Sequence, residues 1–206
     1  MNNRKLIIAL VLGAALVAFL VGVNFYQSRV QTALEQQVAG QAERLVRMHS
    51  PIIGPREAPV TIVEFFDPAC ETCRAFYPVV KQLMQQYPIE VRLVIRYAPF
   101  HQGSEQVVKL LESARRQDKY LAVLEAVLAA QPQWADHGKP NLELAYKAAE
   151  HAGLDMSRAL ADMAAPALDA VVLQDVRDLT ALKVEKTPHL LRQRAPAAQL
   201  WPKTTG

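Results

Sequence analysis

The chain contains only two cysteines, which lie close together in the segment Cys70-Glu71-Thr72-Cys73. An apolar, β-rich run precedes this segment and apolar residues at helical spacing follow it, so it lies at a predicted strand-to-helix junction. At the start of a helix, unpaired backbone N–H groups and the positive end of the dipole favour a thiolate at Cys70. Cys73 lies one turn further on, where it can attack a mixed disulfide formed by Cys70. The pattern predicts reversible disulfide chemistry.

The same two cysteines could instead form half of a structural zinc site. Such a site needs two more ligands, commonly a second Cys-x-x-Cys or two histidines three to five residues apart. The chain has no third cysteine, and its five histidines lack that spacing. Ligand number therefore favours redox chemistry. We expect no metal site, and no cofactor besides a Cys70–Cys73 disulfide.

The N-terminal region predicts a membrane anchor. A basic segment, 1–5, precedes an apolar stretch that ends at Val23 and is long enough as a helix to cross a bilayer. A cleaved signal peptide is the alternative, but its apolar region would be shorter and no convincing cleavage site follows Val17. We therefore expect residues 6–26 to be an uncleaved signal anchor.

The positive-inside rule keeps residues 1–5 in the cytoplasm and places the rest of the chain across the inner membrane, in the periplasm or outside. An oxidising compartment suits a cysteine pair. The net charge of +3 is too small to indicate nucleic acid as a partner. The membrane is thus the first partner that the sequence predicts.

Behind the anchor, the sequence predicts a linker and one α/β domain. Residues 27–50 indicate a helical stalk or spacer, and the prolines and glycine between Ser50 and Pro55 mark the boundary. Strands are predicted over 60–66 and 91–97, parallel to each other because a helix connects them. Further helices are predicted over 102–116 and 119–130, with a break at 131–134, then from Asn141, from Asp155 and between Leu168 and Leu182.

The segment Phe65-Phe66-Asp67-Pro68-Ala69-Cys70-Glu71-Thr72-Cys73-Arg74-Ala75-Phe76-Tyr77-Pro78, together with a distant Val-x-x-Thr-Pro, resembles the DsbA-like thioredoxin-fold proteins. The resemblance covers about residues 50–188. It implies a thioredoxin-like fold over 51–188, with a helical insertion at about 102–181. It also implies a thiol–disulfide oxidoreductase that acts on protein substrates with an unidentified redox partner.

The resemblance also implies roles for individual residues. Cys70 would be the exposed nucleophile and Cys73 the buried resolving thiol. Thr187 and Pro188 would be the Thr–cis-Pro pair that lies beside the disulfide and binds the substrate backbone. Glu64 would be a buried carboxylate that relays the proton of Cys73. An ordinary solvent-facing glutamate remains the equal alternative for Glu64.

The two residues between the cysteines, Glu71 and Thr72, are expected to tune the redox potential. Glu71 places a negative charge beside Cys70 and opposes the helix dipole, which makes the disulfide less oxidising. Two other functions stay open on the same fold. One is a non-catalytic peptide-binding or chaperone module, and the other is a metal-delivery protein.

The segment 189–206 departs from the family, whose fold continues here with two strands and a helix. It shows no strand alternation, contains Pro196 and Pro202, and is short for these elements. The family continuation Thr-Phe-Phe-Val-Asn-Gly becomes His-Leu-Leu-Arg-Gln-Arg, the sequence from His189, when one base is inserted before it. We therefore predict a frameshifted or mis-sequenced tail, missing terminal strands and helix, an unpaired sheet edge and impaired activity.

Overall fold

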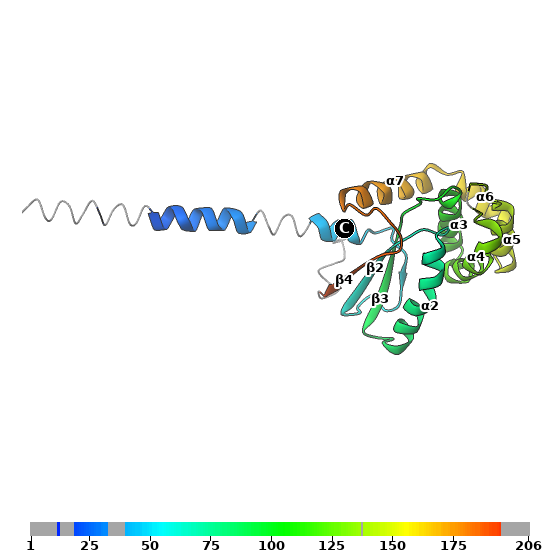
Figure 1. The fold of residues 1–206 in the computed structure, drawn as a ribbon, viewed down its shortest axis with the longest axis horizontal. Coiled ribbons are helices and arrows are strands. Elements are labelled where there is room, and N and C mark those ends of the chain that lie inside the picture. The colour runs from blue at the N-terminus through cyan, green and yellow to red at the C-terminus, as the bar shows by residue number, and fades with distance from the viewer. Residues whose placement is uncertain (1–11, 13–18, 33–39, 137, 195–206) are drawn as a thin grey trace, which may run out of the picture. The chain divides into compact units, whose positions relative to one another are not determined.

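The computed structural model describes residue 12 and residues 19–32, 40–136 and 138–194 (Figure 1). The chain divides into two compact units, Met1–Ala42 and Glu43–Gly206.

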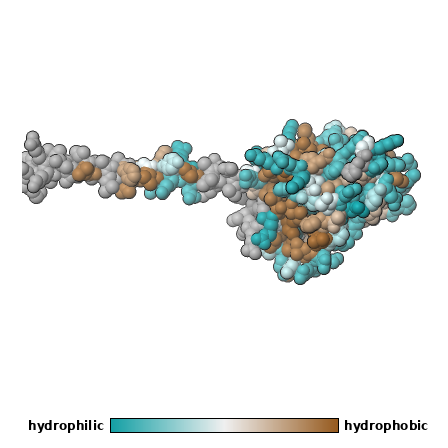
Figure 2. All heavy atoms as spheres, in the orientation of Figure 1, coloured by the Kyte–Doolittle hydropathy of each residue, from teal (hydrophilic) through white to brown (hydrophobic). Residues whose placement is uncertain are grey.

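In the first unit, residues 19–32 are helical and expose large apolar side chains, including Phe19, Phe25 and Tyr26 (Figure 2). Among the described residues, none of the helices is both long and apolar enough to cross a membrane. Most of the stretch that predicts the anchor at 6–26 lies outside the described residues, as does part of the linker, so the anchor stays a prediction.

A four-stranded sheet in the order β1-β3-β2-β4 forms the centre of the second unit. Its strands are β1 (Ile52–Ile53), β2 (Val60–Phe66), β3 (Val91–Tyr97) and β4 (His189–Arg194). β2 and β3 have the predicted bounds and are parallel, joined by α2 (Glu71–Gln86). The two outer strands are antiparallel to their neighbours. The two-residue β1 was not predicted, because its strand signal is too short to separate from the surrounding loop.

Alternate side chains of β2 enter the two cores on either side of the sheet. Ile62 and Phe66 pack in the larger core with α2 and the helical insertion, whereas Val63 and Phe65 pack in the smaller core with α7 (Pro166–Ala181). Figure 1 shows α7 along one side of the sheet and α2 on the other. Because both faces are covered, every residue of β2 and β3 except Val60 is buried, and neither strand alternates between buried and exposed positions.

The helical insertion contains α3 (Ser104–Arg116), α4 (Tyr120–Trp134), α5 (Leu142–His151) and α6 (Met156–Met163) before α7. Asp155 caps α6 as predicted, since its carboxylate accepts a hydrogen bond from the Arg158 N–H at 3.0 Å. The predicted break at 131–134 is wrong. α4 continues through Pro132 because Gln131 and Trp134 are buried there, and this packing outweighs the hydrogen bond that the proline cannot donate.

The expectation that no strand follows Pro188 is also wrong. Residues His189–Arg194 form β4 and pair antiparallel with β2 along its edge. Any backbone free of proline can donate to such a ladder, and the six residues of β4 precede both prolines of the segment. Leu191 packs against the smaller core. The rest of the predicted tail, 195–206, lies outside the described residues.

The compact domain begins earlier than the boundary predicted at 50–51, because Leu45 and Val46 are buried in the smaller core. Arg47 follows them and makes two hydrogen bonds to Asp178 of α7, at 2.8 and 2.7 Å. The residues just before the predicted boundary are therefore part of the domain. The sequence analysis missed them because they are held in the domain by contacts with α7, a helix far along the chain.

A buried network of charges joins this N-terminal segment to the sheet and to α7. Arg96 on β3 is fully buried and donates to Asp175 at 3.0 and 2.7 Å and to Asp178 at 2.7 Å. Asp175 also accepts from the Tyr97 N–H at 2.7 Å and lies 2.7 Å from Nε2 of His49. Removing one partner of such a pair leaves an uncompensated charge in the interior.

We predict that Asp175→Asn lowers the free energy of unfolding by about 3 kcal/mol or more, because it leaves Arg96 buried with too few carboxylate partners. Urea denaturation at neutral pH measures the change. Asp169→Asn on the same helix is the matched control. Its carboxylate is 59% exposed and pairs with Lys109 at the surface, so we expect a loss of at most about 1 kcal/mol. Equal small losses in both variants would show that the buried network contributes no more than a surface pair.

Candidate active site

Cys70 is the N-cap residue of α2, at the end of the short turn that follows β2. Its N–H donates to the Asp67 carbonyl at 3.1 Å, and its own carbonyl accepts from the Arg74 N–H at 3.1 Å. No side chain caps the start of α2. The backbone N–H groups of the first turn therefore remain available to a thiolate at Cys70. The expectation that Cys70 is exposed is wrong for this structure, because the turn and the Thr187-Pro188 segment leave only 6% of it accessible; Cys73 is fully buried, as expected.

The fold brings Thr187 and Pro188 beside Cys70, although more than a hundred residues separate them in the sequence. The Sγ of Cys70 donates to the Thr187 carbonyl at 3.5 Å, and the peptide bond between Thr187 and Pro188 is cis. Both residues are half-buried and lead directly into β4. The pair thus lies where the family resemblance predicted it.

Glu64 lies on β2, with Ile95 of β3 and Leu190 of β4 as its neighbours across the sheet. Only 1% of it is exposed, and its Oε1 has no hydrogen-bond partner among the described residues. Burial raises the pKa of this carboxyl group from 4.5 to about 7. Of the two alternatives that the sequence left open, the structure places Glu64 in the interior.

The thiol of Cys73 is held in its neutral form. Burial raises its pKa well above the usual range, and the negative charges of Cys70 and Glu64 raise it further. A protonated Cys73 is a poor nucleophile until a base takes its proton. Glu64 lies close enough to act electrostatically on this thiol, and its own pKa is raised to about 7.

The carboxylate of Asp67, which the sequence analysis gave no role, organises the turn before Cys70. It is fully buried and accepts hydrogen bonds from the backbone N–H groups of Ala69 at 2.9 Å, Phe100 at 2.8 Å and His101 at 3.0 Å. The Ser104 hydroxyl and Nδ1 of His101 also contact it. The Asp-Pro sequence was a recognisable turn signal, but the partners come from the loop after β3.

The structure places Glu71 and Thr72 at exposed positions in the first turn of α2. This is where a charge at Glu71 acts on the helix dipole. Within the described part of the chain, no group of three or more His, Cys, Asp or Glu side chains is arranged to hold a metal ion.

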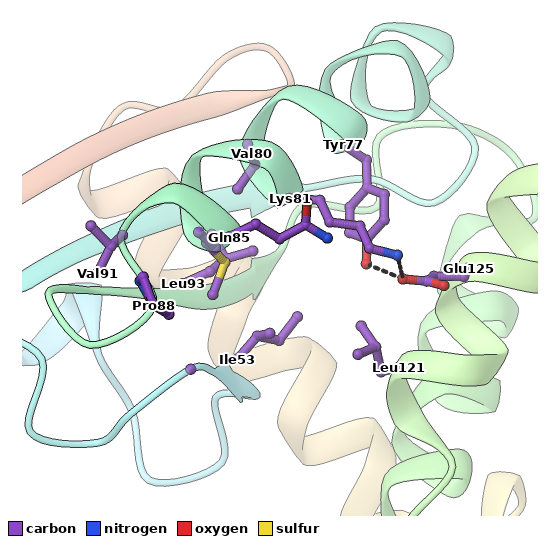
Figure 3. Close-up of a pocket in the computed structure, with 12 residues that line it drawn as sticks. Ile53, Tyr77, Val80, Lys81, Gln85, Pro88, Val91, Leu93, Leu121 and Glu125 are labelled. Atoms are coloured by element: carbon purple, nitrogen blue, oxygen red, sulfur yellow. Dashed lines mark hydrogen bonds and ion pairs between the residues drawn. The ribbon is translucent and has the colours of Figure 1, made fainter.

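An apolar pocket of about 290 Å³ lies further along α2 (Figure 3). Val80, Leu93 and Ile53 form part of its apolar wall. At its polar rim, the Tyr77 hydroxyl and the Lys81 ammonium group donate to the Glu125 carboxylate at 3.1 and 2.5 Å. This combination of an apolar interior and a few convergent polar groups is typical of a binding pocket.

Comparison with known proteins supports the same fold. The chain matches the thioredoxin family over residues 47–193. It is 31% identical to the crystal structure of a thioredoxin-like oxidoreductase from Silicibacter pomeroyi, with a TM-score of 0.65 over 77% of this chain and 92% of that one. The fold is shared with alpha-DsbA1 from Wolbachia pipientis (18% identity, TM-score 0.65, 72% and 77% covered). BdbD from Bacillus subtilis shares it too (19% identity, TM-score 0.63, 72% and 83% covered).

Two similar curated proteins are named as antiporters. The Na(+)/H(+) antiporter NhaA 3 of Salinispora tropica is 33% identical over 138 residues, which are 66% of this chain and 20% of the antiporter. NhaA of Herminiimonas arsenicoxydans is 29% identical over 137 residues, 66% and 21% of the two chains. The chain therefore spans about a fifth of the length of these relatives. The match over residues 47–193, the sheet topology and the Cys-x-x-Cys helix opposite a cis-proline lead to one conclusion: the chain belongs to the thioredoxin family.

Proposed function

We propose that the protein is a thiol–disulfide oxidoreductase that exchanges disulfides with protein substrates through its Cys-Glu-Thr-Cys segment. The observation that supports this most directly is Cys70 at the start of α2, where its Sγ contacts the Thr187 carbonyl and where the buried carboxyl group of Glu64 acts electrostatically on its partner Cys73. The Cys70 thiolate attacks a substrate disulfide, forms a mixed disulfide and releases one substrate thiolate. Cys73 then attacks the Cys70 sulfur, which releases the second substrate thiolate and closes the Cys70–Cys73 disulfide. The same steps run in reverse when substrate thiols are oxidised.

Glu64 takes the role of proton acceptor for Cys73 in this proposal. The thiol must lose its proton before it attacks, and its raised pKa makes this loss unfavourable without a base. A carboxyl group with a pKa of about 7 takes up that proton and releases it again at neutral pH. Thr187 and Pro188 lie where a substrate backbone can pair next to Cys70.

We further propose that the domain works on the exported side of a membrane, held by the N-terminal segment. The exposed apolar side chains of residues 19–32 support an interaction with lipid. Two relatives that share about a fifth of their length with this chain are named as Na(+)/H(+) antiporters, which supports the proposal because such exchange takes place across a membrane.

A non-catalytic peptide-binding module is the second candidate, and the pocket beside Tyr77 favours it because an apolar side chain of a bound peptide would fit there. Turnover separates the two functions. An oxidoreductase accelerates the reduction of insulin by a thiol or the oxidation of a dithiol peptide, whereas a binding module does neither.

We predict that Cys70→Ser abolishes disulfide exchange, whereas Cys73→Ser accumulates mixed disulfides between Cys70 and substrate because no thiol resolves them. Non-reducing electrophoresis and mass spectrometry detect the trapped species. Because Cys73 is fully buried with a raised pKa, a limiting dose of iodoacetamide should label Cys70 first. Preferential labelling of Cys73 would reverse the assignment of the two roles.

We predict a pH dependence of stability that comes from Glu64. Its folded-state pKa is raised from 4.5 to about 7, so between these values the folded protein keeps a proton that the unfolded chain has lost. The contribution is therefore complete below about pH 4.5 and is lost as the pH rises through 7, a decline of about 3 kcal/mol. Glu64→Gln removes this decline, so urea unfolding should find the variant more stable than the unaltered protein at pH 8. The exposed Glu90→Gln is the control and should keep the decline. Parallel curves for all three proteins would contradict the raised pKa.

We predict that Glu71→Gln makes the Cys70–Cys73 disulfide more oxidising. The substitution removes a negative charge that opposes the helix dipole beside Cys70, so the thiolate of the reduced form becomes more stable. Equilibration against a series of glutathione ratios gives the potential. An unchanged or lower potential would show that the charge at Glu71 does not act on Cys70.

A further inference from the structure

Gln131 connects the helical insertion to the turn that carries the nucleophile. It lies in the last turn of α4, is 1% exposed, and reaches across to the segment between β2 and α2. Its Nε2 donates to the Pro68 carbonyl at 2.8 Å and to the Cys70 carbonyl at 3.0 Å. The two amide hydrogens therefore bind the carbonyl oxygens of the residues on either side of Ala69 in the turn.

The oxygen of the same amide points to a role beyond packing. Oε1 of Gln131 is buried and has no hydrogen-bond partner among the described residues. A buried acceptor without a partner is unfavourable, so an apolar side chain of similar volume would fill this space without that penalty. The two donated hydrogen bonds are thus the favourable contribution that the amide makes at this position.

We infer that Gln131 is a positioning residue for Cys70, through which the helical insertion sets the redox potential of the cysteine pair. By holding the carbonyls of Pro68 and Cys70, the amide fixes the turn that directs the first N–H groups of α2 towards the Cys70 sulfur. Its own hydrogens add partial positive charge beside Cys70. Both effects stabilise the thiolate, hence the reduced form, and make the disulfide more oxidising. This inference rests on the proposed function, since it concerns the same cysteine pair.

The test replaces the amide by groups of similar size that cannot donate. Gln131→Met removes both donors and fills a similar volume, and Gln131→Leu removes them with a shorter, branched side chain. Two quantities are measured for each variant: the rate of Cys70 alkylation as a function of pH, and the equilibrium constant of the disulfide with glutathione. We expect the alkylation midpoint to move to higher pH and the equilibrium constant to fall by about fivefold or more, in the less oxidising direction.

Gln133→Met is the matched control, because Gln133 lies two residues away on the same helix and is exposed. It should leave both quantities unchanged. Thermal unfolding of the oxidised and the reduced forms separates positioning from structure. A structural residue would destabilise both forms equally, whereas a positioning residue destabilises the reduced form more. If Gln131→Met does not fold, Gln131→Leu carries the same test.

Two results would overturn the inference. One is an unchanged alkylation midpoint and equilibrium constant in a folded Gln131 variant, whatever its melting temperature. The other is a shift towards a more oxidising disulfide. Both quantities are read from the protein's own cysteines without a substrate. If the unaltered chain fails to form its disulfide reversibly, the proposed function fails with the inference. If it forms the disulfide and the variants match it, only the role of Gln131 is wrong.

Discussion

The position of Cys70 depends on the buried carboxylate of Asp67. Three backbone N–H groups, one hydroxyl group and one imidazole nitrogen surround its two oxygens, and they come from the active-site turn and from the loop after β3. A carboxylate with this many donors can remain in the interior without a lysine or arginine beside it. It joins the ends of the two parallel strands, which is where an α/β sheet places its functional loops. The carboxylate thereby holds the turn whose last residue, Cys70, is the N-cap of α2.

Two further polar side chains, Glu64 and Gln131, act on the start of α2, one from β2 and the other from α4. Glu64 lies in the apolar interior under α2, where burial raises its pKa and leaves one oxygen without a partner. Gln131 approaches from α4 and contacts the backbone of the turn. Each of these two groups is buried with one oxygen that has no hydrogen-bond partner among the described residues, and this costs stability. Polar groups that are unfavourable for folding and that converge on one pair of cysteines indicate a site shaped for chemistry.

The opposite face of the sheet carries charges of another kind. Arg96, Asp175 and Asp178 satisfy one another in the interior, and Arg47 joins them from the segment that precedes the sheet. These groups lie on the side of α7, away from the core that contains the cysteines. Their partners are nearly complete, in contrast to Glu64. The network therefore joins the N-terminal segment, β3 and α7, whereas the unpaired oxygens of Glu64 and Gln131 lie on the side of the cysteines.

The sequence by itself determined the local elements. Short-range patterns predicted the bounds of β2 and β3, their parallel pairing and the cysteine pair at the start of a helix. The spacing of apolar residues and the length of the connection between two strands can both be read from consecutive residues. Only the tertiary structure decided that Glu64 is buried, that Gln131 contacts the turn, that Asp67 gathers its donors, and that His189–Arg194 completes the sheet. Each of these facts depends on partners far along the chain. A strand at a sheet edge pairs through its backbone, so its side chains need not show a strand pattern. Whether a polar group is buried depends on the residues that surround it in space, which the sequence around that group does not reveal.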